Sequence, residues 1–184
     1  METHKPIRIT FALDEKDAAY FRSLYQEAKK NAENLDPSSV TESARGLISR
    51  VRSSKRVPSF VSEAIGTLET LMEMLEDKDY ALPKAEASTV LAALAYFANP
   101  QDLIPDDVPG LGFLDDAIMI KIMENEFKHE LWGFRQFVKF RSGAEQRPWT
   151  SVARQRLPER LLDQRRKLRA EVDRRKKERS FSWW

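Results

Sequence analysis

Five aspartates lie within residues 99–116, which read NPQDLIPDDVPGLGFLDD and are called here the Asp/Pro segment. If this segment folds back on itself, four of the carboxylates can converge on one hard cation, because Mg²⁺ and Ca²⁺ prefer oxygen ligands. The spacing is not that of an EF-hand, whose ligands alternate around a central glycine and end on a glutamate. We therefore predict a candidate site for Mg²⁺ or Ca²⁺, with the ligands Asp102, Asp106, Asp115 and Asp116. No organic cofactor and no catalytic residue are indicated.

The Asp/Pro segment also has a structural interpretation that needs no metal. Its last two aspartates stand at the expected start of a helix, where negative charge is favourable. The earlier ones would cap tight turns whose shape is set by three prolines, at positions 100, 105 and 109. Leu103 and Ile104 would then hold the segment against the core. The sequence leaves both interpretations open, together with a third, in which the segment is a contact surface for a phosphate group or a protein.

The Asp/Pro segment resembles the signature of the YkvA family, a widespread bacterial domain of unknown function. The matching positions are Tyr96, Pro100, Asp102, Ile104, Pro105, Asp106, Pro109, Gly112, Asp115 and Asp116. The resemblance covers about residues 87–122. It implies no particular reaction, since none is established for the family. Association with membranes, as in many relatives, is a further implication of the resemblance.

The charge of the chain is divided along its length. Residues 1–134 carry 15 Lys or Arg against 23 Asp or Glu, a net charge of −8, whereas residues 135–184 carry 16 against six, a net charge of +10. We therefore predict an acidic helical domain, residues 1–145, followed by a basic C-terminal helix and aromatic tail, residues 146–184. Such asymmetry is typical of a solvated arm or an anion-binding element.

The basic tail is the second candidate site. A helix is expected from Pro158 to about residue 179, with a narrow apolar seam made by Leu161, Leu168 and Val172. That seam suits one helix neighbour, either in the same chain or in a second copy. The side chains that could instead bind an acidic membrane surface or a nucleic acid are Arg165, Arg166, Arg169, Arg174, Arg175, Lys176, Lys177, Phe181, Trp183 and Trp184.

Hydrophobic periodicity predicts the elements that position these residues. Alternation over residues 7–13 predicts a short strand or an extended arm. Helices are then expected to start near Asp14, at a capping box of Ser39 with Glu42, at Pro58, at Pro83, near Leu114 and at Pro158. The fourth is almost wholly apolar over residues 87–98 and belongs at the centre, and the fifth runs unbroken to residue 140. The predicted fold class is all-α, a bundle of five to six helices.

Composition and motifs narrow the function classes. The chain has no cysteine, which excludes disulfides and thiolate metal sites, and its longest apolar run, residues 90–98, is too short for a transmembrane helix. His129 and Glu130 begin a zinc-protease pattern, but the position of the second histidine is Gly133. We expect a cytoplasmic protein, peripheral to the membrane if attached to it, that acts as a non-enzymatic interaction or scaffolding module with a protein partner or its own copy. The alternatives are a divalent-metal-dependent enzyme using the aspartates, and nucleic-acid binding through the basic tail.

Overall fold

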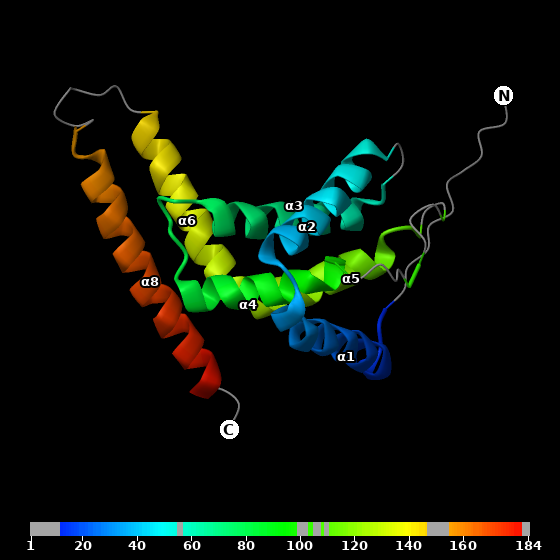
Figure 1. Cartoon of the computed structure of the whole chain (residues 1–184). Helices are drawn as coiled ribbons and strands as arrows, with labels where there is room; N and C mark the ends of the chain where they lie inside the picture. Colours follow the sequence, from blue (N-terminus) through cyan, green and yellow to red (C-terminus); the bar gives the residue numbers. More distant parts are fainter. Residues whose placement is uncertain are drawn as a thin grey trace.

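The computed structural model is all-α, which confirms the predicted fold class. It describes residues 12–54, 57–98, 103–104, 108, 111–146 and 155–181. Seven α-helices and two short 3₁₀ helices (η) lie in this described part (Figure 1): α1 Glu15–Asn31, η1 Ala32–Asn34, α2 Pro37–Ser53, α3 Ser59–Glu76, α4 Lys84–Leu94, η2 Ala95–Ala98, α5 Leu114–Glu126, α6 Lys128–Glu145 and α8 Leu157–Phe181. The predicted strand falls largely on residues 7–11, which lie outside the described residues.

The first two helices begin with aspartate caps. In α1 the carboxylate of Asp14 accepts hydrogen bonds from the backbone N–H groups of Lys16 and Asp17, and the Asp17 side chain accepts one from the Asp14 N–H. Helix α2 starts at Pro37, with Asp36 as its cap. The predicted capping box of Ser39 is therefore wrong. An aspartate followed by proline makes an earlier start, since the carboxylate accepts an orphan N–H and proline suits the first turn.

The long helix expected over residues 114–140 is two helices. It breaks at Phe127, whose backbone leaves the helical region at φ −96° and ψ 18°. No proline or glycine lies at the break, and the Phe127 ring is buried. The break allows α5 to pack on α3 while α6 turns away to pack on α8, so tertiary packing ends the helix where the local sequence has no breaker.

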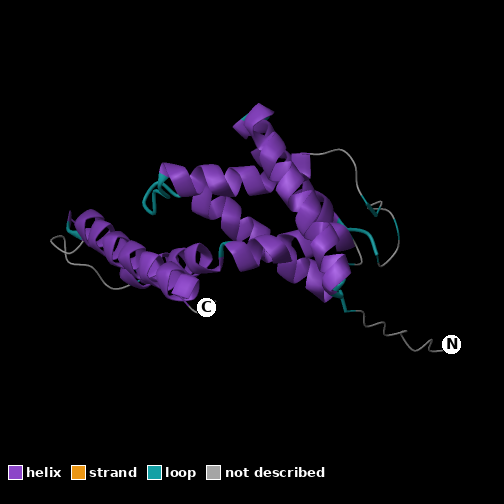
Figure 2. Cartoon of the chain, turned by 90° about the horizontal axis from the view of Figure 1, so that it is seen from below, coloured by secondary structure: helices purple, strands orange, loops and turns teal. Residues whose placement is uncertain are grey.

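Helix α4 and η2 lie in the middle of the bundle and contact α1, α2 and α3, as expected for the most apolar segment (Figure 1). Helices α3 and α5 pack side by side, and α1 packs along another flank of α5. Helix α8 lies at one side of the molecule against α6, as both Figure 1 and Figure 2 show. None of the described helices is long and apolar enough to cross a bilayer.

Candidate functional site

The Asp115 carboxylate ties the Asp/Pro segment to the start of α5. One oxygen, Oδ2, accepts hydrogen bonds from the backbone N–H groups of Leu103, at 2.9 Å, and Ile104, at 3.2 Å. Asp115 lies in the first turn of α5 and is only 2% exposed. A buried carboxylate at this position is favoured by the positive end of the helix and by two N–H donors. The arrangement is a staple between two parts of the backbone.

The Asp/Pro segment ends in a tight turn that leads directly into α5. The Gly112 N–H donates to the Val108 carbonyl at 2.8 Å, and the Leu114 N–H to the Leu111 carbonyl at 3.1 Å. Phe113, the residue before α5, has a left-handed backbone with φ 67°, which is costly for a residue with a side chain. Its ring is buried, so packing compensates the strain of the turn.

The predicted site residues are only partly placed together. Asp115 and Asp116 are both buried in the first turn of α5, whereas Asp102 and Asp106 lie outside the described residues. Within the described ranges no group of three or more His, Asp or Glu side chains is arranged to hold a metal ion. The four-aspartate site therefore stays a prediction.

Leu103 does not hold the segment against the core as expected. Its side chain is 44% exposed, whereas that of Ile104 is half-buried. Both backbone N–H groups point to one carboxylate oxygen, so the turn is positioned by polar contacts of its backbone rather than by two apolar side chains.

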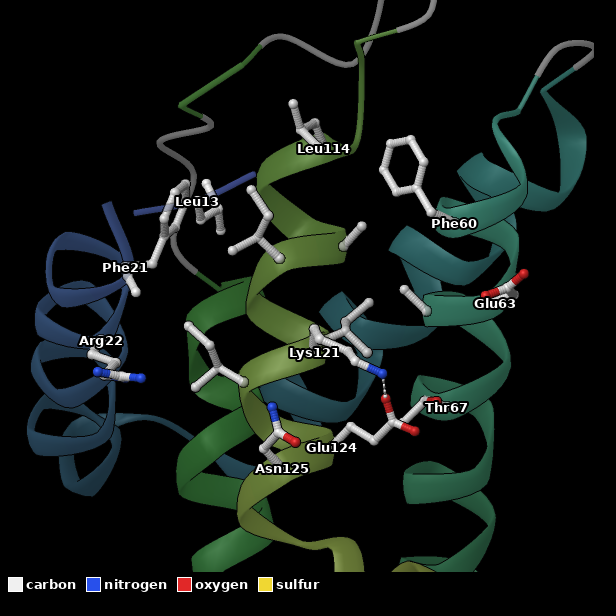
Figure 3. A pocket seen from close by; sticks show the side chains of 16 residues that line it. Leu13, Phe21, Arg22, Phe60, Glu63, Thr67, Leu114, Lys121, Glu124 and Asn125 are labelled. Carbon is white, nitrogen blue, oxygen red and sulfur yellow. Dashed lines mark hydrogen bonds and ion pairs between the residues drawn. The ribbon is translucent and has the colours of Figure 1, made fainter. Parts of the chain in front are cut away.

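An open apolar groove runs beside this staple, along the outer face of α5. Figure 3 shows α5 as its floor, with α1 on one side and α3 on the other. Its volume is about 660 Å³. The lining is mainly apolar, with Ile118 and Ile122 on α5, Phe21 on α1, Phe60 on α3, and Leu13 at one end. The sequence contained a signal for it, since α5 is apolar on more faces than a helix packed on one side requires.

The groove carries a small number of charges. Lys121 and Glu124 form an ion pair of 2.6 Å on α5. Arg22 on α1 and Glu63 on α3 lie on opposite walls, as Figure 3 shows, and both are exposed. Neither forms an ion pair with another residue of the described part. Each wall thus carries one exposed charged residue, Arg22 or Glu63, that has no ion-pair partner among the described residues.

Helix α8 docks on its own body through the predicted seam, because Leu161, Leu168 and Val172 are all buried and α6 is its main neighbour. At Gly133 of α6 the two helices approach so closely that an added Cβ would lie 2.7 Å from Cγ2 of Val172. Sequence reasoning considered Gly133 only as the residue that breaks a zinc-protease pattern and missed its packing role, although a glycine inside a helical pattern is a known signal of close packing.

Four of the candidate cationic side chains of the tail contact this same body. The Arg165 guanidinium donates to the Asp79 carbonyl at 3.2 Å, and that of Arg169 to the Tyr80 carbonyl at 3.1 Å. The Arg175 guanidinium lies 3.6 Å from the centre of the Trp132 ring. Lys176 pairs with the buried Glu130 at 2.5 Å. The residues of the body that contact α8 include Asp79, Tyr80, Ala81, Glu130, Trp132, Gly133 and Phe140.

The remaining tail candidates are exposed or undescribed. Arg166 pairs with Asp163 at 3.7 Å, and Arg174 pairs with Glu171 and Glu178, at 2.6 and 2.5 Å, all on α8 itself. Lys177 is exposed. The side chains of Phe181, Trp183 and Trp184 lie outside the description. Local pairing therefore neutralises much of the positive charge on the outer face of α8.

Residues of both α6 and α8 contact the turn between α3 and α4. The carboxylate of Asp77 accepts from the Tyr80 N–H and pairs with Arg141 of α6 at 2.7 Å. Burial alone would raise the pKa of Asp77, but these hydrogen bonds and the Arg141 charge outweigh it and hold the pKa below its ordinary 3.8. Burial also raises the pKa of Tyr80 to about 12, and its ring packs on Phe134 and Phe137.

Comparison with known proteins places the staple and most of the groove floor in a shared segment. A family described as "Protein of unknown function (DUF1232)" matches residues 88–122. The chain is also 35% identical, over 83 residues, to the "Uncharacterized membrane protein YkvA" of Bacillus subtilis (strain 168), and the alignment covers 43% of this chain and 76% of that relative. The chain belongs to the YkvA family. No solved structure matches it.

The resemblance predicted from the Asp/Pro segment is therefore confirmed. The YkvA-family segment contains Asp115, the strained turn at Phe113 and the first two and a half turns of α5, up to Ile122. It thus includes the three isoleucines of α5 that line the groove, Ile118, Ile120 and Ile122. The α8 helix and its docking surface on α6 lie outside the matched residues.

Proposed function

We propose that this YkvA-family chain is a non-enzymatic interaction module whose docking surface is the groove along α5. One observation carries the proposal: an apolar groove of about 660 Å³ lies open between α1 and α3, with its floor largely in the family segment. Apolar surface of this extent, rimmed by polar groups, is typical of interaction sites. The Asp115 staple supports it, because the staple holds the start of the floor helix in place.

Site-directed photo-crosslinking in cells that naturally encode the chain tests this proposal. A photoreactive phenylalanine analogue replaces Phe60, an exposed ring lining the groove, and in a matched control it replaces Tyr20, an exposed ring on α1 outside the groove. We expect one adduct that forms at position 60 and not at position 20. The crosslinked protein is then identified, purified and bound to the wild type and to Ile118→Asp.

Binding that is weakened about tenfold or more by Ile118→Asp supports the groove as the docking surface. Leu111→Asp is the control, because Leu111 is exposed and apolar but does not line the groove. Equal adducts at the two crosslinking positions, or equal affinities of wild type and Ile118→Asp, would show that the partner binds elsewhere.

We also propose that the protein acts in the cytoplasm at a membrane surface. The Bacillus subtilis relative is called a membrane protein, which supports a membrane location, and so do the exposed leucines at positions 13, 103 and 111 near the start of α5. Co-sedimentation with phosphatidylcholine vesicles, with and without phosphatidylglycerol, tests this second proposal. We expect Leu111→Asp to reduce the bound fraction, and no sedimentation of the wild type with either vesicle would overturn it.

A further inference from the structure

The groove along α5 has the shape and chemistry to take one more helix. Its lining runs from Leu114 to Asn125 on the floor, which is about 16 Å at 1.5 Å per residue. One wall is α1, from Ala18 to Arg22, with Leu13 just before that helix, and the other is α3, from Phe60 to Thr67. Side chains of three helices form the surface, and the backbone groups of the floor are already paired within α5. An extended peptide would find no backbone partners there, whereas a helix satisfies its own.

Among the described residues, a second copy of the chain offers no helix for this position. Apart from the face of α5 that lies open in the groove, the apolar faces of the described helices are used in their own bundle, and the seam of α8 is covered by α6. That open face is the floor of a groove between α1 and α3, so the same floor of a second copy cannot enter the groove as a protruding helix. The large apolar side chains that remain exposed are scattered over separate elements: Leu13, Tyr20, Leu35, Phe60, Leu103 and Leu111. The occupant is therefore a different protein.

The two walls differ in charge, which gives the occupant a direction. Arg22 on the α1 wall and Glu63 on the α3 wall are exposed and form no ion pair within the described residues. Figure 3 shows them on opposite sides of α5. A helix with an acidic flank and a basic flank pairs with both walls in one direction only, because turning it end over end exchanges its flanks.

We infer that the α5 groove binds an amphipathic helix of a partner protein, with its acidic flank against Arg22 of α1 and its basic flank against Glu63 of α3. This inference rests on the proposed function and names the class of partner. The apolar stripe of that helix, with residues at i, i+3, i+4 and i+7, would cover Ile118 and Ile122. The existing Lys121–Glu124 pair lies on the floor between the two walls.

The probe is a synthetic amphipathic helix of about 15 residues, long enough to be partly helical in water. It carries leucines on one stripe, glutamates along one flank and lysines along the other. We expect measurable binding by fluorescence anisotropy, and a loss of about tenfold or more with Ile118→Asp but not with Leu111→Asp. A peptide of the same composition without the stripe is the matched control. Equal binding of both peptides, or of wild type and Ile118→Asp, would overturn the inference.

The direction of the bound helix along the groove is determined by disulfide trapping. The chain has no cysteine, so only an introduced cysteine can react with the peptide. The peptide has a cysteine at its N-terminus, and its flanks are ordered so that the charges match when that end lies beside Leu13. Leu13→Cys and Asn125→Cys mark the two ends of the groove. Under mild oxidation we expect the Leu13→Cys variant to trap the peptide, and the combination Arg22→Glu with Glu63→Arg to move trapping to Asn125→Cys.

The outcomes separate this inference from the proposed function. If both cysteine variants trap the peptide equally, or charge reversal changes nothing, the assignment of the flanks is wrong. A partner crosslinked at position 60, together with no binding of the peptide, would overturn the helix inference and leave the docking function in place. Self-association of the wild type that Ile118→Asp abolishes would identify a second copy as the occupant and would also overturn it.

Discussion

Helices α5 and α8 differ in how much of their surface is open to a partner, and the difference is the opposite of what their compositions suggest. Helix α8 is rich in arginine and lysine, yet at least five of its cations contact the body of the protein or a ring on it. Helix α5 is far less charged and starts with buried carboxylates, yet one of its faces lies open in a groove. The charge of a segment therefore does not reveal whether its surface is available. What matters is the position of each residue relative to the apolar seam.

The reason lies in the length of the side chains and in the number of neighbours. Arginine and lysine have long apolar stems, so residues beside a seam can cover it and still place their charged ends on carbonyl groups, rings or carboxylates. Helix α5 has α1 and α3 on its two flanks, and no described element covers the face between them. A surface is left open when no neighbour reaches it, whatever the residues it contains.

The largest expected loss of stability comes from a substitution at the start of α5. Asp115→Ala removes the acceptor of two backbone N–H groups that are themselves partly buried, and it should lower the free energy of unfolding by about 2 to 4 kcal/mol. Urea denaturation monitored by circular dichroism measures this loss. A change below about 0.5 kcal/mol would show that the staple does not hold the turn.

Measuring the melting temperature with added divalent ions is the control for Asp115→Ala. It distinguishes the metal-binding interpretation of the Asp/Pro segment from the structural one. If the staple is the whole role of Asp115, saturating Mg²⁺ or Ca²⁺ leaves the melting temperature of the chelator-treated wild type unchanged. If the predicted metal site exists, either ion raises the melting temperature, and Asp115→Asn abolishes the rise.

The second-largest expected loss of stability comes from a substitution at Gly133, which tests how closely α8 packs on α6. Gly133→Ala should destabilise the protein by about 1 to 3 kcal/mol, because its new Cβ overlaps Val172 of α8. Gly143→Ala, in the same helix with open space around it, should instead stabilise by about 0.5 to 1 kcal/mol. Limited proteolysis of Gly133→Ala should release α8 earlier than in the wild type. If both variants shift stability in the same direction, α8 is not packed against Gly133.

The smallest expected effect depends on pH and concerns the turn that receives α8. The pKa of Asp77 is lower in the folded protein than its ordinary 3.8, so its contribution is complete well above 3.8 and is lost as the pH falls through the lower folded value. Asp77→Asn should therefore cost about 1 kcal/mol at neutral pH, since one partly buried ion pair with Arg141 is lost. The stability difference should disappear on acidification below 3.8. A difference that stays constant into the acid range would contradict this assignment.

Much of this protein was determined by local sequence. The periodicity of three and four residues predicts the helices, and the seam of Leu161, Leu168 and Val172 predicts the docking face of α8. The Asp/Pro segment identifies the family, and it marks Asp115 as a residue with a special role, although not the role itself. These features depend on residues close in the chain, where spacing alone decides which side chains share a face.

Only the tertiary structure decided how those faces are used. The break at Phe127, the inward position of Arg165 and Arg169, and the open face of α5 all depend on contacts between residues far apart in the chain. Periodicity shows that a face is apolar, but it contains no information on whether another helix covers it. The free energy of packing is set by neighbours that the chain brings together only on folding. For this reason the sequence indicates that α5 is apolar on several faces, but only the fold shows that one of them stays open as a groove.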